Sequence, residues 1–350
     1  MMLTTQTPWA AIAALLLSFL PLATATFSVG GVDTKRQLMG AAGASCVFDE
    51  SIKDVLYVSV PNAGVLLTQA KSASHNSVMV NTAVGMMESG TAPQVILGVM
   101  TDLSLDNTTE DVEADSMTGP TVTYNDYELR QYGLVDFKGR YAGYESPVLK
   151  EYYTDLCYNE SIGIDYTQEN FGGQVITSDT TYAYTAQGNI IALPTVMGIV
   201  DGFRDGPSTP ACQEDLIDRL FHAISAPFLQ LQEAVEAEDL ALATGDIRCF
   251  GLNEAPAAGI FLKVEDAAGN VIIDIDIVND SMGFTDFTYN PFPDFVAMYD
   301  AWRAENPCGS ITGNATNAPT PTPTPSSASS VFAMLGFAMT VQLSCLLVIL

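Results

Sequence analysis

Two hydrophobic periods alternate along the chain between residues 26 and 306. Apolar or small residues that alternate with polar ones, or run together between turn residues, predict strands in segments 26–33, 37–48, 63–70, 129–145, 181–190, 257–266 and 270–278. Apolar residues three and four positions apart predict helices in segments 76–90, 92–103, 194–206, 213–245 and 293–306. Turn residues at 33–36, 136–139 and 267–270 predict three hairpins, and Gly90 separates the first two helices. Pro227 is expected to bend or break the long helix.

The order of these elements predicts an α+β fold. Strands grouped in hairpins and helices grouped in pairs favour antiparallel sheet covered by helical layers, and the absence of βαβ alternation argues against a doubly wound nucleotide-binding sheet. The second strand is very small-sided over residues 40–44, which is typical of a sheet that another layer approaches closely.

Both ends of the chain differ from this globular region. Residues 1–25 hold a short apolar run that ends in Ala23-Thr24-Ala25, which predicts a secretory signal peptide. Residues 309–330, rich in Thr, Ser and Pro, predict an extended, O-glycosylated stalk. Residues 331–350 form an apolar tail with no basic residue after Arg303, which favours a removed GPI-anchor signal; the alternative is a terminal membrane helix. The globular domain is therefore 26–308.

The charge is −28, from 13 basic and 41 acidic residues. It argues against nucleic acid or anionic lipid as a partner and fits an exposed extracellular surface. Much of it lies in segment 106–115, expected to be a solvated loop. We expect the protein on the outer face of the cell membrane, held by its C-terminal anchor. Four sequons fit a secretory route and are candidate glycosylation sites: Asn107, Asn159, Asn279 and Asn314.

Six cysteines are present, at positions 46, 157, 212, 249, 308 and 345. Removal of the tail leaves five, so at most two disulfides form, and Cys46, in its small-residue run, is expected to be the buried free thiol. No cysteine or histidine cluster has metal-ligand spacing, and Asp274 and Asp276 alternate with Ile as on the polar face of a strand. We expect neither a metal nor a cofactor.

Histidine-based hydrolysis is a poor fit to this sequence. His75 and His222 are the two histidines, no GxSxG motif is present, and each histidine is most simply a surface or helix-packing residue.

Thr26 offers another chemistry. If cleavage after Ala25 makes it the first residue, its α-amine, with a pKa of about 7.7–8.0, can act as the base for its own hydroxyl. The plainer interpretation is that Thr26 merely follows a cleavage site.

At this point the chain resembles a known family. The segments "TFSVGGVD", "GAAGASC", "GVLLTQA", "RQYGLVDFKGRYAGY", "QGNIIALPTVM" and "GDIRCFGLNEAPAAGIFLKVED" look like the Ntn-hydrolase-like family called domain of unknown function 1028. The resemblance covers about residues 26–300 and implies the four-layer α-β-β-α sandwich of N-terminal-nucleophile hydrolases.

The resemblance also implies site residues. The leading Thr falls on Thr26, and Asn189 of the Gln-Gly-Asn segment is a candidate donor to an oxyanion. In the Gly-Asp-x-Arg segment, Arg248 either holds a substrate carboxylate or pairs with Asp246. The residues after that motif depart from the family pattern, and the lysine that activates Thr in proteasome-type members has no counterpart here, because Lys35 lies in a turn. For Asn189 and Arg248 a structural role is the alternative.

Two hypotheses follow from these residues. The first is an extracellular, membrane-anchored amide hydrolase that uses Thr26 on a small-molecule or peptide amide. The second is a cell-surface binding or structural protein that keeps the same fold without turnover. The position of the family's leading Thr directly after the predicted cleavage signal Ala23-Thr24-Ala25 favours the first hypothesis. The missing lysine and the altered residues after the Gly-Asp-x-Arg motif favour the second.

Overall fold

The computed structural model describes residues 26–45, 51–70, 78–102, 109–113, 121–125, 130–145, 166–177, 180–207, 212, 215–236, 257–278 and 290–310. The helices are α2 Ile52–Leu56, α3 Val78–Glu88, α4 Pro93–Met100, α6 Leu193–Asp205, α7 Leu216–Glu236 and α9 Phe292–Glu305. The strands are β1 Thr26–Asp33, β2 Leu38–Ser45, β3 Tyr57–Val60, β4 Gly64–Ala70, β5 Thr109–Glu113, β6 Thr121–Asn125, β7 Arg130–Asp136, β8 Tyr141–Tyr144, β9 Tyr166–Ile176, β10 Thr181–Ala192, β11 Gly259–Asp266 and β12 Val271–Ile277.

Two antiparallel sheets make the centre of the molecule. The larger has six strands in the order β12-β11-β2-β1-β10-β9, and the smaller has four in the order β3-β4-β7-β8. A separate hairpin pairs β5 with β6. Because β1 lies between β2 and β10, the strand that begins at Thr26 is central in the larger sheet.

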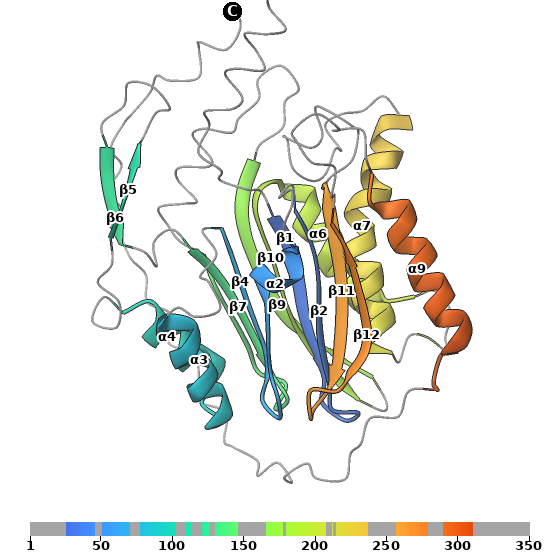
Figure 1. Ribbon diagram of the computed structural model, residues 1–350, viewed down its shortest axis with the longest axis horizontal. Coiled ribbons are helices and arrows are strands. Elements are labelled where there is room, and N and C mark those ends of the chain that lie inside the picture. Colours follow the sequence, from blue (N-terminus) through green and yellow to red (C-terminus); the bar gives the residue numbers. More distant parts are fainter. Residues whose placement is uncertain are drawn as a thin grey trace, which may run out of the picture.

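Helices cover the outer face of each sheet (Figure 1). One core joins the larger sheet to α6, α7 and α9, a second joins the smaller sheet to α3 and α4, and a third lies between the sheets and includes residues of α2. The arrangement is a helix layer, two facing sheets and a second helix layer. The expected α+β class, with antiparallel sheets covered by helices, is confirmed.

Small residues of β1 and β2 allow this close packing. A Cβ at Gly31 would stand 3.0 Å from the Phe203 ring of α6, and one at Gly30 would stand 3.2 Å from the Leu67 side chain on β4 of the smaller sheet. A larger side chain at either position would separate the layers.

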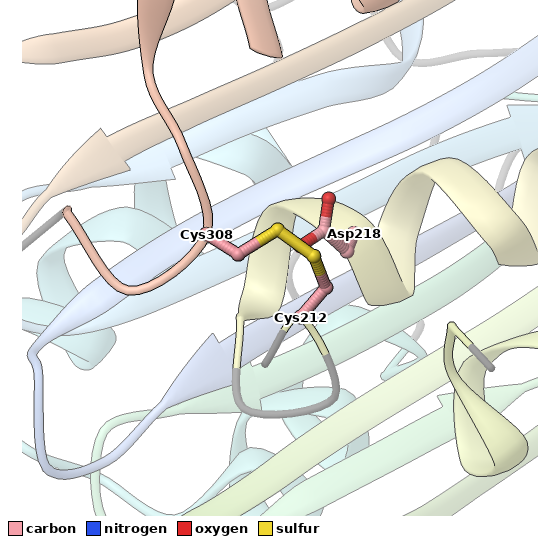
Figure 2. Close-up of side chains that lie close together, drawn as sticks. All are labelled: Cys212, Asp218 and Cys308. Atoms are coloured by element: carbon pink, nitrogen blue, oxygen red, sulfur yellow. A yellow bond between two sulfur atoms is a disulfide. The ribbon is translucent and has the colours of Figure 1, made fainter. Parts of the chain in front are cut away.

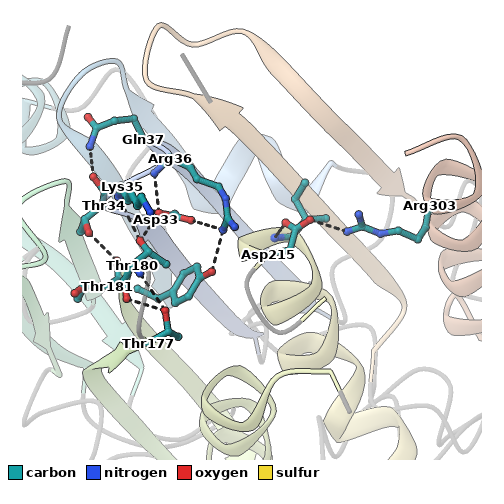
Figure 3. A network of polar contacts seen from close by, with 12 residues as sticks. Asp33, Thr34, Lys35, Arg36, Gln37, Thr177, Thr180, Thr181, Asp215 and Arg303 are labelled. Carbon is teal, nitrogen blue, oxygen red and sulfur yellow. Dashed lines mark hydrogen bonds and ion pairs between the residues drawn. The ribbon is translucent and has the colours of Figure 1, made fainter. Parts of the chain in front are cut away.

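The β1–β2 turn is fixed by a buried carboxylate. Asp33 is fully buried; its Oδ1 accepts from the backbone N–H groups of Lys35 (3.0 Å) and Arg36 (2.9 Å) and from Thr180 Oγ1 (2.6 Å). Its Oδ2 accepts from the Arg36 guanidinium at 3.1 Å (Figure 3). The turn is thereby tied to the residues just before β10. Lys35 lies in this turn, as expected, at the far end of β1 from Thr26.

Most of the predicted elements are present, with four differences. Residues 109–113 were expected to be part of a solvated loop, but they form β5, which pairs in register with β6, a strand that was also not predicted; Val112 lies opposite Val122. Pro227 does not end α7, which continues to Glu236; Phe228 and Leu231, which follow it, are buried in the core and hold that part of the helix. The third difference is the short helix α2 with the strand β3 that follows it, and the fourth is the strand β9. None of these elements was predicted.

Several predictions concern residues outside those described. They are the signal peptide 1–25, most of the stalk, the apolar tail 331–350, and Cys46. No helix within the described residues is long and apolar enough to cross a membrane.

Candidate functional site

Three polar side chains lie side by side at the start of β1. In the larger sheet Thr26 pairs in register with Ser45 on β2 and with Asn189 on β10. The hydroxyl oxygens of Thr26 and Ser45 are 2.9 Å apart. Thr26 is 3% exposed, Ser45 1% and Asn189 0%. The structure therefore brings together two of the predicted site residues, Thr26 and Asn189, and adds Ser45.

Strand alternation turns these side chains toward the smaller sheet. Phe27 and Val29 belong to the core under the helices, so Thr26 and Ser28 face the space between the sheets. Ser28 Oγ donates to Gln69 Oε1 on β4 at 2.8 Å. Gln69 Nε2 in turn lies 3.4 Å from the Thr26 carbonyl oxygen, so the smaller sheet holds the start of β1.

A chain of carboxamides extends this contact across the sandwich. Gln69 Nε2 donates to Gln131 Oε1 at 2.5 Å, and Gln131 Nε2 donates to the Glu169 carbonyl oxygen at 2.7 Å. Asn170 Nδ2 donates to Gln187 Oε1 at 3.1 Å. We call this group of side chains the polar layer; its members are Thr26, Ser28, Ser45, Gln69, Gln131, Asn170, Gln187 and Asn189. All are uncharged, so the layer orders the end of β1 without burying an ion.

Two polar atoms in and beside the polar layer have no hydrogen-bond partner among the described residues. Thr185 Oγ1 and Gln187 Nε2 are in fully buried residues and make no hydrogen bond within the described part of the chain. Thr185, Gln187 and Asn189 alternate along β10, which places the three on the same face of the strand. A buried polar group without a partner costs free energy, and such groups are uncommon in folded proteins.

The sequence did not identify most of the polar layer. Ser45, Gln69, Gln131 and Asn170 were not predicted as site residues. A signal was present, because Ser28, Ser45 and Gln69 are polar residues at inward positions of strands that are otherwise small or apolar. The sequence does not show which side chains of the two sheets meet. Ser28 and Gln69, which form a hydrogen bond between the sheets, are 41 residues apart.

The other predicted site residues lie outside the described residues. They are Asp246 and Arg248 and the four sequon asparagines, Asn107, Asn159, Asn279 and Asn314. His75 also lies outside them. His222 is on α7 with its ring edge toward Phe221, and burial lowers the pKa of its imidazole, in agreement with a helix-packing role.

Asp274 and Asp276 form ion pairs on the polar face of β12. Lys53 Nζ lies 2.7 Å from Asp274 Oδ1 and 3.5 Å from Asp276 Oδ2, and Ser51 Oγ donates to Asp276 at 2.6 Å. The lysine fixes α2 to the larger sheet. This agrees with the expectation that the two carboxylates line the polar face of a strand.

A second polar cluster lies where α7 begins and the chain leaves α9. Cys212 and Cys308 are joined by a disulfide, with Asp218 beside them on the first turn of α7 (Figure 2). Potential ligand atoms of these three residues lie within 4.8 Å of one another, which is the spacing of a metal site. Because the sulfurs are bonded to each other, they are not thiolate ligands. The sequence did not predict which cysteines pair.

Buried charges surround Asp218. Arg303 Nη2 lies 2.6 Å from Asp218 Oδ1 and 3.2 Å from Asp215 Oδ2, and the second of these pairs is visible in Figure 3. The Tyr299 hydroxyl also donates to Asp218 Oδ1. Burial raises the pKa of Asp218 to about 7; the nearby Asp215 carboxylate adds to the rise, and Arg303 opposes it.

Comparisons with known proteins identify a similar solved structure. No family model matches the chain, and no curated protein matches it. The crystal structure of protein SPO2555 from Silicibacter pomeroyi, of the family DUF1028, is similar to the chain with a TM-score of 0.44 and 14% sequence identity. The match covers 80% of this chain and 86% of that chain.

Proposed function

We propose that the chain is an Ntn-hydrolase-like member of the family domain of unknown function 1028, and an amide hydrolase with Thr26 as its nucleophile. Removal of residues 1–25 gives Thr26 a free α-amine. That amine accepts the hydroxyl proton while Oγ attacks the substrate carbonyl carbon, and Asn189 donates to the oxyanion that forms. The leaving amine takes the proton, and water then hydrolyses the acyl ester to release a carboxylic acid.

One observation carries this proposal. The hydroxyl of Thr26, the residue that cleavage would expose, lies in a polar layer between two sheets, beside Ser45 and Asn189. A hydroxyl in such surroundings has groups at hand that can orient it, and an adjacent amide can donate to a developing negative charge. The roles of Asp246 and Arg248, as an ion pair or as a carboxylate-binding site, belong to the same proposal.

The proposal sets a requirement at Thr26. Thr26 is 3% exposed, and a nucleophile must be reached by its substrate. The proposal therefore also requires the end of β1 to open to the substrate.

We further propose that the mature protein lies on the outer face of the cell membrane. The support comes from the leader, the stalk and the apolar tail, and from the four sequons at Asn107, Asn159, Asn279 and Asn314. The GPI signal and a terminal membrane helix remain the two alternatives for the tail.

A non-catalytic binding or structural role is the second candidate, and the lysines favour it. Of the lysines within the described residues, Lys35 lies in the turn at the far end of β1, and Lys138 Nζ lies 3.4 Å from the Gly90 carbonyl oxygen. Lys53 forms an ion pair with Asp274, and Lys263 forms one with Glu265. None of these four amines is a partner of Thr26 in the contacts described above.

The test uses the mature protein secreted from eukaryotic cells. Its intact mass should show a free Thr26 at one end and, at the other, either a lipid anchor or residues 331–350. On a panel of amide substrates Thr26→Ala should lose at least about 10³-fold in turnover, and Thr26→Ser should keep part of it. Turnover of the wild type should rise as pH increases through about 8, because the amine must be neutral to accept a proton.

Thr82→Ala on α3 serves as the matched control, because it removes a threonine hydroxyl from the surface of another layer. A mature chain that begins after Thr26, or equal turnover by Thr26→Ala and the wild type, would show that the amide-hydrolase proposal is wrong. Absence of turnover across the whole panel, by a wild-type chain that begins at Thr26, would instead favour the binding or structural role.

A further inference from the structure

The cluster at the start of α7 contains a disulfide and a carboxyl group that faces it. Cys308 Sγ lies 3.9 Å from Asp218 Oδ2, and both cysteines are partly exposed, whereas Asp218 is 1% exposed. The two cysteine residues are thus partly open to solvent, while the carboxyl group beside them is shielded from water.

The two oxygens of Asp218 have different surroundings. Oδ1 accepts from Arg303 Nη2 at 2.6 Å and from the Tyr299 hydroxyl. Oδ2 has the Cys308 sulfur as its neighbour among the contacts of the described residues. Because the donors occupy Oδ1, a proton bound by this carboxyl group resides on Oδ2, the oxygen next to the sulfur.

The charges around Asp218 favour such a proton. Asp215, on the same helix, brings a second buried carboxylate, and Arg303 is shared between the two. Arg219, the next residue on α7, points away and donates to the Phe203 carbonyl oxygen at 2.7 Å. Burial, and after it the Asp215 charge, raises the pKa of Asp218 to about 7, while Arg303, which both carboxylates share, opposes the rise.

We propose that the Cys212–Cys308 bond is a reducible switch and that Asp218 is its proton donor. The thiolate of an external dithiol attacks Cys212 Sγ and forms a mixed disulfide. The Cys212–Cys308 bond breaks, and Cys308 Sγ leaves with the electron pair and takes the proton from Asp218 Oδ2. The second thiol of the reagent, as thiolate, then displaces Cys212, which is protonated by solvent, so the dithiol is oxidised and the protein gains two thiols.

Reduction has a structural consequence in this place. The disulfide ties Cys308, just after α9, to Cys212, which lies shortly before α7 in the chain. Breaking it frees the segment that leads into the stalk from the globular domain, while the Arg303 ion pairs still hold α9. The proposal does not depend on the chemistry of Thr26.

The test measures the rate at which dithiothreitol reduces the folded, oxidised protein between pH 5.5 and 8.5. Maleimide labelling detects the new thiols, and each rate constant is divided by the concentration of reagent thiolate. For the wild type this normalised constant should fall at least about tenfold as pH rises through 7, because ionised Asp218 has no proton to donate and repels the departing thiolate. In Asp218→Asn the profile should be flat.

Two further variants separate this role from a merely structural one. Asp215→Asn removes the neighbouring charge, so the fall should persist and move to lower pH. Asp54→Asn, on the exposed face of α2, should behave as the wild type does. A flat profile in the wild type, the same fall in Asp218→Asn, or reduction that occurs only at the rate of global unfolding would overturn the proposal.

Discussion

Thr185 and Thr180 show how differently two buried threonines can contribute to stability. Thr180 Oγ1 donates to the buried Asp33 carboxylate at 2.6 Å, whereas Thr185 Oγ1 has no partner within the described residues. A hydrogen bond to a charged group stabilises a fold, and a buried hydroxyl without a partner destabilises it. The two residues lie on or just before the same strand, so they form a matched pair.

We expect Thr185→Val to raise the free energy of unfolding by about 1 kcal/mol, because valine has nearly the same shape and loses no hydrogen bond. Thr180→Val should lower it by about 1.5–3 kcal/mol, because it leaves Asp33 short of a donor. Urea unfolding of both variants measures the two changes. A loss of stability in Thr185→Val would mean that its hydroxyl has a partner, such as a buried water.

At the scale of elements, the glycines of β2 and α4 have opposite surroundings. A Cβ at Gly40 would stand 2.4 Å from the Lys263 carbonyl oxygen on β11. A Cβ at Gly98, on α4, would have nothing within 4 Å. The first glycine is required by the spacing of two strands, and the second only adds chain entropy to the unfolded state.

Gly98→Ala should therefore stabilise the protein by about 0.5–1 kcal/mol, whereas Gly40→Ala should destabilise it by at least about 1–3 kcal/mol, because backbone atoms must move. Thermal unfolding of the two variants distinguishes the effects by their sign. Equal behaviour of the pair would contradict the packing described for β2 against β11.

Helices and strands could be predicted from the sequence where the periodic pattern of apolar residues extends over enough positions. The hairpins around residues 33–36, 136–139 and 267–270 and the long helices are present as predicted. The α2 helix and β3 have five and four residues, too few for a periodic pattern. In β9, Gly172 and Gly173 interrupt the strand pattern, and its pairing with β10 supplies the order that local propensity lacks.

The candidate site was only partly predictable for a related reason. Thr26 and Asn189 come from local motifs, but the polar layer depends on which strands face each other. Gln69 and Gln131 are 62 residues apart in sequence, and the hydrogen bond between them exists because β4 pairs with β7. Strand pairing of this range is a property of the whole fold, which no local pattern encodes.

At the scale of the whole molecule, the disulfide joins segments 96 residues apart. Cross-linking so long a segment restricts the unfolded chain strongly. We expect the double variant Cys212→Ser/Cys308→Ser to unfold with a free energy lower by about 3–5 kcal/mol than the oxidised wild type. Urea unfolding measures this change, and the reduced, alkylated wild type is the control. Equal midpoints for all three proteins would mean that the bond adds no stability.

The same bond decides how tension would travel through the protein. A load applied to the chain beyond Cys308 passes through sulfur to Cys212 and bypasses the stretch between them, which holds α7, β11, β12 and α9. Those elements carry no tension while the disulfide is intact. The 96-residue segment, with an extended length of roughly 320 Å, is then not stretched. Reduction would therefore do more than lower stability: the load would then pass through α9 and enter the larger sheet at its edge strands β12 and β11.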